Sequence, residues 1–153
     1  MSKKAHQPKR IVNRRAKFDY ELGDSLVVGL QLTGAETKAL RMGHGQLRGA
    51  YVTVKDGELW LINAQINSAR GVIIAEQDET RSRKLLAKRR EIDALVEAKK
   101  DGRTIVPLEL LTQGRYIKLK ISVGRGKKRY DKRETLKKRQ QELDINRIAN
   151  RNF

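Results

Sequence analysis

The chain has 153 residues, 38% of them apolar and 35% charged, which leaves room for one domain with a modest core. Lysine and arginine total 35 against 18 acidic residues, and the formal charge of +17 favours a polyanionic partner, because like charges oppose compact folding. The sequence has no cysteine, no signal-peptide pattern and no apolar run near the roughly 18 residues of a membrane-spanning helix, so disulfides are excluded and we expect a cytoplasmic protein.

The first segments of the chain differ in their apolar patterns. Residues 1–17 are rich in basic residues and contain no acidic ones, so we expect a mobile basic N-terminal arm. A folded domain is expected over residues 18–123, and a short helix over residues 36–42, which Gly43 ends as a C-cap glycine does. A strand is predicted near the start of this domain, because apolar residues occupy every second position: Leu26, Val28, Leu30 and Leu32.

Further strands are predicted along the rest of this domain. Asp56-Gly57 lies between two β-rich runs, residues 51–54 and 58–62, which is typical of a hairpin. The apolar run 72–75 predicts another strand, and two more are expected over residues 104–110 and 116–123, with Pro107 at an edge or bulge. In the last strand one face is apolar: Ile117, Leu119, Ile121 and Val123.

One substantial helix is predicted between these strands. Asp78 can cap its beginning and Asp101-Gly102 can end it. Its apolar face is expected to hold Leu85, Ile92, Leu95 and Val96. About six short strands with one main helix and short helices predict a mainly β, α+β protein: a small six-stranded antiparallel OB-like barrel with an extended basic C-terminal tail.

The tail, residues 124–153, is strongly basic. Its large aliphatic residues are few and widely spaced: Leu136, Leu143, Ile145 and Ile148. Such a thin apolar stripe cannot dock a helix firmly, so we expect a tail that is disordered when free and helical when it meets RNA.

The residues that could support catalysis are sparse. His6 lies in the predicted arm and His44 in a glycine-flanked turn, and without cysteine neither completes a metal site. Gly43-His-Gly-Gln46 has a passing likeness to the Gly-Gly-Gln motif of peptide-release factors, but a tight turn explains these glycines better. We therefore expect no enzyme activity, no metal and no cofactor.

Two basic clusters favour a nucleic-acid partner. The first is predicted to crowd the opening turns of the long helix, where each cation would oppose the helix dipole at about 0.3–1 kcal/mol unless phosphates balance it; it contains Arg81, Arg83, Lys84, Lys88, Arg89 and Arg90. The second places Tyr130 among cations, an arrangement that can stack a base while neighbours hold phosphates; it contains Lys127, Lys128, Arg129, Lys132 and Arg133. RNA is preferred over DNA because no helix-turn-helix pattern is present.

Blocks of residues that run in order through the chain resemble the SmpB family of SsrA-binding proteins. The blocks are Asn13 to Ala16 with Asp19-Tyr20, Gly29 to Gly34, Glu36 to Arg41, Tyr51, Gly57-Glu58, Asp78 to Leu86 with Glu91-Ile92, Gly102-x-Thr104, and Gly126-Lys127-Lys128 with Asp131-Lys132-Arg133. Each block alone is weak, but their order and spacing over nearly the whole chain are highly specific.

The resemblance implies an OB-like barrel and a role in bacterial trans-translation. Members bind the tRNA-like domain of tmRNA (SsrA RNA), and the alanyl-tmRNA complex with elongation factor Tu reaches ribosomes stalled without a usable stop codon. The tail of such a protein reads the empty mRNA channel and decoding centre, against rRNA of the small subunit. We expect a monomer that has no membrane contact.

The resemblance also implies roles for individual positions. The tmRNA-binding residues would be Tyr20, Glu36, Lys38, Arg41, Arg81, Arg83, Lys84, Leu86 and Gly126. The tail residues at the ribosome would be Lys127, Lys128, Tyr130, Asp131, Lys132, Arg133 and Ile148. Tyr130 stands where many relatives have a histidine that stacks on rRNA; a phenol can stack but cannot carry imidazolium charge.

The chain departs from the family pattern at a few positions. Val27 replaces a typical glutamate, Lys88 replaces a histidine or asparagine, Glu79 stands where proline usually follows the aspartate, and Asn67 begins a segment that lacks the usual Pro-Tyr element.

Two other functions remain open. A ribosomal barrel protein that binds rRNA constitutively would share the charge and the fold. A peptidyl-tRNA hydrolase would need a water-positioning motif that the sequence lacks.

Overall fold

The computed structural model describes residues 10–151, except for the side chains of residues 129–131 and 151. Its elements, in chain order, are β1 (Ile11–Val12), α1 (Ala16–Asp19), β2 (Tyr20–Leu30), α2 (Gly34–Arg41), β3 (Gly45–Gln46), β4 (Tyr51–Lys55), β5 (Glu58–Ile62), β6 (Gln65–Ile66), the 3-10 turn η1 (Glu76–Asp78), β7 (Arg83–Leu86), α3 (Arg89–Lys100), β8 (Thr104–Leu111), β9 (Lys118–Gly126) and α4 (Arg129–Arg151). The fold is mixed α+β.

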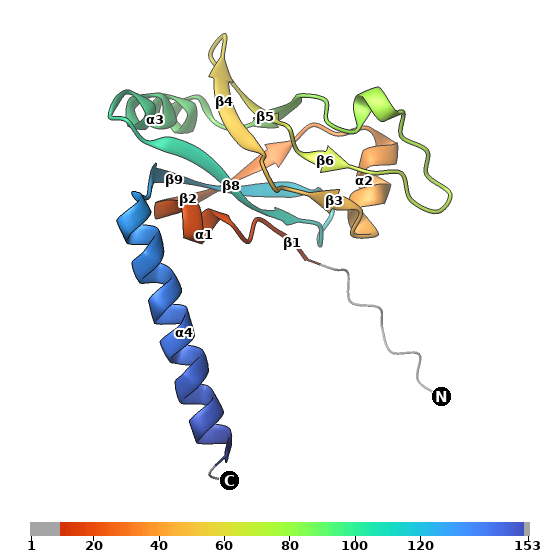
Figure 1. Ribbon diagram of the computed structural model, residues 1–153. Coiled ribbons are helices and arrows are strands. Elements are labelled where there is room, and N and C mark those ends of the chain that lie inside the picture. The colour runs from red at the N-terminus through yellow and green to blue at the C-terminus, as the bar shows by residue number, and fades with distance from the viewer. Residues whose placement is uncertain (1–9, 152–153) are drawn as a thin grey trace, which may run out of the picture.

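Seven of the strands form one antiparallel sheet in the order β1-β8-β9-β2-β7-β5-β4, while β3 and β6 form a separate pair. β4, at one end of this order, packs against β8, so the sheet curls back on itself (Figure 1). The expected count of six strands is wrong for the described residues, because short edge segments such as β1, β3 and β6 are too brief to leave a periodic signal in the sequence.

The core lies inside the curled sheet and is closed by α2 and α3. In β9 the predicted alternation is confirmed from Lys118 to Ile121, since Leu119 and Ile121 are fully buried while Lys118 is exposed. It ends there, because Ser122 is also buried and its hydroxyl bonds to the carbonyls of Gly23 and Asp24. The predicted bulge at Pro107 is also confirmed, because the register between β8 and β9 shifts between Pro107 and Glu109.

The predicted hairpin is present as β4 and β5, with Lys55 paired to Glu58 across the turn. Asp56 and Gly57 have φ angles of 52° and 74°, the left-handed pair that a two-residue hairpin turn needs. Arg89 Nη1 donates a hydrogen bond of 3.2 Å to the carbonyl of Gly57, which ties the hairpin tip to the start of α3.

α2 is confirmed as a two-turn helix, and its beginning explains its position. Thr33 Oγ1 accepts a hydrogen bond from the backbone N–H of Glu36, and the Glu36 carboxylate accepts one from the backbone N–H of Thr33. This reciprocal capping box fixes the Glu36 side chain at the first turn. Gly43 follows the helix with a φ of 85°.

The structure corrects the predicted start of the long helix. Residues 83–86 form β7, a strand between β2 and β5, and α3 begins only at Arg89. In β7 Arg83 and Leu85 point inward and Leu86 outward, so strand pairing outweighs the helical spacing that the sequence offered. Asp78 therefore caps no long helix, and Arg81, Arg83 and Lys84 do not oppose its dipole.

Two further expectations are corrected by the structure. Residues 72–75 form no strand; an isolated bridge joins Ala69 to Val72 around a turn, and Ser68 Oγ bonds both backbone groups of Ile74. The predicted arm is also shorter, because β1 pairs with β8 and Ile11 is buried. Residues 1–9 lie outside the described part of the chain.

The tail forms one 23-residue helix, α4, which projects away from the sheet and ends far from it (Figure 1). Strand β9 continues to Gly126, so the sheet extends three residues beyond the predicted boundary at Val123. That α4 is disordered in the free protein remains a prediction. No helix within residues 10–151 is both long and apolar enough to cross a membrane.

Candidate nucleic-acid interface

A buried ion cluster joins α2 to the segment before β7. The Glu36 carboxylate accepts hydrogen bonds from Arg81 Nη2 and Arg83 Nε. Arg83 has no exposed surface, and its remaining N–H groups bond to carbonyl oxygens, at 2.7 Å to Ala64 and at 3.1 Å each to Asp78 and Glu79. One guanidinium therefore fixes the path of residues 78–81 over the sheet.

The ionisation of this cluster follows from its contacts. Burial by itself would raise the pKa of Glu36, but the hydrogen bonds from Arg81, from the Thr33 backbone and from Arg83 outweigh it and hold that pKa below its ordinary value. Burial also lowers the pKa of Arg83, against the attraction of Glu36, yet a guanidinium stays protonated at neutral pH. The cluster is thus a charged network in which every partner is satisfied.

Glu36 and Arg83 were predicted to bind RNA, but the structure places both inside the protein. Glu36 is 2% exposed and Arg83 is 0% exposed, so neither side chain can reach a ligand in this conformation. Arg81 differs, because about a third of its side chain is exposed next to Glu36. These three predicted RNA-binding residues thus divide into two buried residues that position a loop and one residue at the surface.

A second group of predicted residues lies on the outer face of β2, β7 and β9, which we call the lysine hollow. Its volume is about 600 Å³, and its lining includes Val27, Lys84, Leu86, Lys88 and Lys118. Val27 and Leu86 are about half exposed, an unusual arrangement for aliphatic side chains in the middle of a sheet. The Cβ of Leu86 lies 3.0 Å from the place where a side chain at Gly29 would begin, so a larger residue there would crowd Leu86.

The charge balance of the lysine hollow favours anions. Lys84 Nζ forms a 2.8 Å ion pair with Glu58, which satisfies one cation. Lys88 and Lys118 are exposed at the same hollow, where Glu91 accepts a hydrogen bond from the Lys88 backbone. Exposed aliphatic surface between cations can contact sugars and bases while the lysines hold phosphates.

Sequence reasoning identified Lys84 and Leu86 in this hollow but missed the contribution of Lys118. The signal was available, because Lys118 lies on the polar face of an alternating strand. Only the pairing of Gly29 with Lys118 on one side and Leu86 on the other brings these three segments together.

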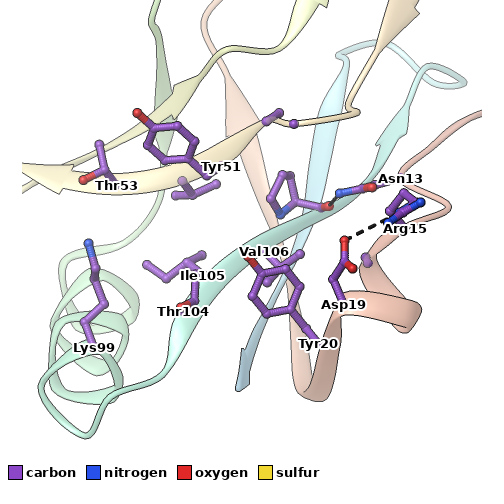
Figure 2. Close-up of a pocket in the computed structure, with 15 residues that line it drawn as sticks. Asn13, Arg15, Asp19, Tyr20, Tyr51, Thr53, Lys99, Thr104, Ile105 and Val106 are labelled. Atoms are coloured by element: carbon purple, nitrogen blue, oxygen red, sulfur yellow. Dashed lines mark hydrogen bonds and ion pairs between the residues drawn. The ribbon is translucent and has the colours of Figure 1, made fainter. Parts of the chain in front are cut away.

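Tyr20 and Gly126 were predicted together and the structure brings them together, as partners in the β2–β9 ladder. Tyr20 also lines a hollow of about 430 Å³ between β4 and β8. Figure 2 shows Tyr20 and Tyr51 entering this hollow from different strands, beside the Arg15–Asp19 ion pair. The two rings are available at its surface, since Tyr51 is half exposed and Tyr20 is partly exposed.

The two predicted residues of α2 outside the ion cluster, Lys38 and Arg41, are both exposed, but they differ in their contacts. Lys38 is exposed and close to solvent, which suits a phosphate contact. Arg41 instead holds the loop after β8, donating hydrogen bonds of 2.9 Å to the carbonyl of Thr112 and 3.0 Å to that of Arg115. Its guanidinium has a structural role that sequence could not reveal.

The root of α4 is attached to α1. The backbone N–H of Lys127 donates a 2.8 Å hydrogen bond to the carbonyl of Asp19, and Lys127 Nζ donates one of 2.8 Å to Thr135 Oγ1. Lys132 Nζ lies 3.4 Å from the Asp19 carboxylate and 5.7 Å from the centroid of the Phe18 ring. These contacts set the direction in which α4 leaves the sheet.

The remaining tail residues lie along α4 beyond this root. Arg133 and Ile148 are exposed, as are Leu136 and Leu143, so the helix presents its cations and aliphatic residues to solvent. Tyr130 and Asp131 belong to the helix, but their side chains lie outside the described residues, and their roles remain predictions. Within the described residues, no group of three or more histidine and carboxylate side chains could hold a metal.

Comparisons with known proteins show to which family the chain is similar. A family model described as SmpB protein matches residues 10–151. An SsrA-binding protein from Trichormus variabilis is 42% identical over 151 residues, covering 96% of this chain and 97% of that protein. Another from Streptococcus thermophilus is 41% identical over 137 residues, covering 89% of each. A solved chain described as "tmRNA-SmpB: a journey to the center of the bacterial ribosome" is 34% identical with a TM-score of 0.64, covering 83% of this chain and 94% of that chain.

Proposed function

The chain belongs to the SmpB protein family, and from that premise we propose that it binds the tRNA-like domain of tmRNA and delivers alanyl-tmRNA to stalled ribosomes in trans-translation. The observation that carries this proposal is a family match that spans both the sheet and α4, residues 10–151. The fold of the proposed RNA-binding body is of the OB-like class, which the curled antiparallel sheet supports. No catalytic step is part of the proposal.

In the proposed complex, the lysine hollow and Arg81 contact tmRNA. Lys84, Lys88 and Lys118 hold phosphates, and Leu86 contacts a sugar or base. Glu36 and Arg83 act as positioning residues, because they hold the loop that presents Arg81. Lys38 and Tyr20 extend the surface toward α2 and the start of β2.

The test of this proposal is co-purification of the tagged protein from its own cells, followed by sequencing of the bound RNA. We expect strong enrichment of tmRNA over its cellular abundance. Recovery of rRNA without enriched tmRNA would instead favour a protein that binds rRNA constitutively. With purified tmRNA, log affinity should fall linearly with log salt, with a slope of roughly −0.7 to −0.9 for each phosphate neutralised.

The proposed role of α4 is to probe the empty mRNA channel and the decoding centre of the small subunit. Its 23 residues give a helix about 35 Å long at 1.5 Å per residue, with cations along its exposed surface. The tail becomes fully ordered only against rRNA. Tyr130 stacks on an rRNA base there, while Lys127, Lys128, Lys132 and Arg133 hold phosphates and Ile148 contacts the channel wall.

Removing residues 131–153 separates the two roles of the protein. We expect the shortened protein to bind tmRNA with affinity within about threefold of the full chain, because the proposed tmRNA surface lies on the sheet and α2. Peptide tagging on stalled ribosomes should be abolished. Loss of tmRNA binding in the shortened protein would contradict this division of labour.

Two further partners and a location complete the proposal. The protein works as a monomer within the complex that alanyl-tmRNA forms with elongation factor Tu. Its site of action is the cytoplasm, where stalled ribosomes are found.

A further inference from the structure

A third hollow lies between β1 and β3, and it shares Asn13 and Arg15 with the hollow that Tyr20 lines. Its volume is about 600 Å³, and four arginines line it: Arg10, Arg14, Arg15 and Arg48. We call it the arginine hollow. The sequence resemblance gave none of these four side chains a role, and the buried ion cluster does not involve them.

The charge of the arginine hollow is only partly balanced within the protein. Arg10 forms an ion pair with Glu109 at 2.9 Å, and Arg15 lies 3.7 Å from Asp19. Arg14 and Arg48 are exposed, and no hydrogen bond or ion pair joins either side chain to another residue in the described range 10–151. No acidic residue lines the hollow itself.

The residue type is informative as well as the charge. Lysine and arginine are about equally common in the sequence, yet every cation in this hollow is arginine. A solvated face needs only charge, for which lysine serves as well. A planar guanidinium with a fork of N–H donors adds two-point hydrogen bonding to phosphate oxygens.

One uncharged donor stands beside the arginines. β1 pairs with β8 and β3 pairs with β6, and β1 and β3 lie next to each other with no ladder between them. The exposed Gln46 of β3 lines the hollow, and its side-chain amide can donate to an anion there.

The arginine hollow and the lysine hollow share no lining residue. β8 lies between β1 and β9 in the sheet, which sets β1 roughly 10 Å from the nearest strand of the lysine hollow. We propose that the arginine hollow is an additional RNA-binding site, in which Arg14 and Arg48 hold phosphates of an RNA backbone and Arg10 and Arg15 support them. The net charge of +17 attracts polyanions in general, and RNA is the occupant that we assign because the chain belongs to the SmpB protein family.

The first test measures salt dependence with a double variant, Arg14→Gln with Arg48→Gln. Both side chains are exposed, so the variant should keep its thermal midpoint. With one of two probes, a tmRNA transcript or purified small ribosomal subunits, we expect the slope of log affinity against log salt to shrink by roughly 0.7 to 0.9 for each arginine. The matched control, Lys55→Gln with Arg70→Gln, removes the same charge from exposed positions outside the hollow. With either RNA probe, we expect the control to change the salt slope by less than half of the change that the Arg14→Gln/Arg48→Gln variant shows.

The second test locates the RNA. Because the chain has no cysteine, Gln46→Cys places one iron-EDTA group at the rim of the hollow, and Asp101→Cys places one at the end of α3. We expect strand scission from position 46 at nucleotides that position 101 does not cut. Scission in tmRNA or in small-subunit rRNA would support the site and identify which RNA occupies it.

No scission from position 46, together with unchanged slopes, would overturn the inference. A competition experiment with polyglutamate could also overturn it. If polyglutamate displaces the RNA from the unaltered protein but not from the Arg14→Gln/Arg48→Gln variant, the hollow prefers an acidic peptide. These results are independent of the proposed function, which fails only if the unaltered protein shows no preference for tmRNA over unrelated RNA.

Discussion

Replacing Glu36 by glutamine should destabilise the fold far more than an exposed charge change would. The variant keeps the size of the side chain but leaves the Arg83 guanidinium, which has no exposed surface, without a counter-charge. Breaking a buried pair in this way costs about 3–5 kcal/mol, because the remaining charge stays desolvated. Glutamine also carries N–H donors that would face those of Arg81 and Arg83.

The assay is urea unfolding at pH 7, followed by circular dichroism and by fluorescence of the single tryptophan, Trp60 in β5. We expect a free energy of unfolding lower by at least about 3 kcal/mol. The control is Glu58→Gln, which removes a carboxylate from the partly exposed pair with Lys84 and should cost about 0–1 kcal/mol. Equal losses in the two variants would refute the reasoning.

The pH dependence of the same pair gives a second readout. The folded pKa of Glu36 lies below its ordinary value of 4.5, so the ionised carboxylate stabilises the fold above about pH 4.5. That stabilisation is lost as the pH falls through the folded pKa. The unaltered protein should therefore lose stability steeply below pH 4.5, and Glu36→Gln should show a shallower loss in that window.

Three further predictions concern the turn, the root of α4 and the tail. Gly57→Ala should lower the free energy of unfolding in urea by about 1–2 kcal/mol, because φ is 74° and the new Cβ would lie 3.0 Å from Arg89 Nη1. The control, Gly34→Ala, has open space at its Cβ and should leave that free energy unchanged. Asp19→Asn removes the carboxylate beside Lys132, so amide hydrogen exchange in the first turns of α4 should become about two- to fivefold faster. The control, Asp144→Asn near the far end of α4, should leave the exchange rate of those turns unchanged. Tyr130→Ala should impair peptide tagging more than tmRNA affinity; equal losses in both assays would place the ring on tmRNA instead.

The sequence by itself determined the parts of this protein that depend on local patterns. Alternation located β9, Asp56-Gly57 located the hairpin, and Gly43 located the end of α2. These features are readable because turn residues and two-residue periodicity act over a few neighbours. The charge of +17 and the ordered family blocks likewise indicated an RNA partner before any geometry was known.

Tertiary structure alone decided what the charged residues do. Arg83 and Lys84 are adjacent in the sequence, yet one is buried against Glu36 and the other lies at the lysine hollow, because a strand turns successive side chains to opposite faces. The sequence favoured a helix there, and only pairing with β2 and β5 made the segment a strand. The tertiary fold also brings Arg14 and Arg48 to one hollow between the unpaired strands β1 and β3, an arrangement that no local pattern encodes.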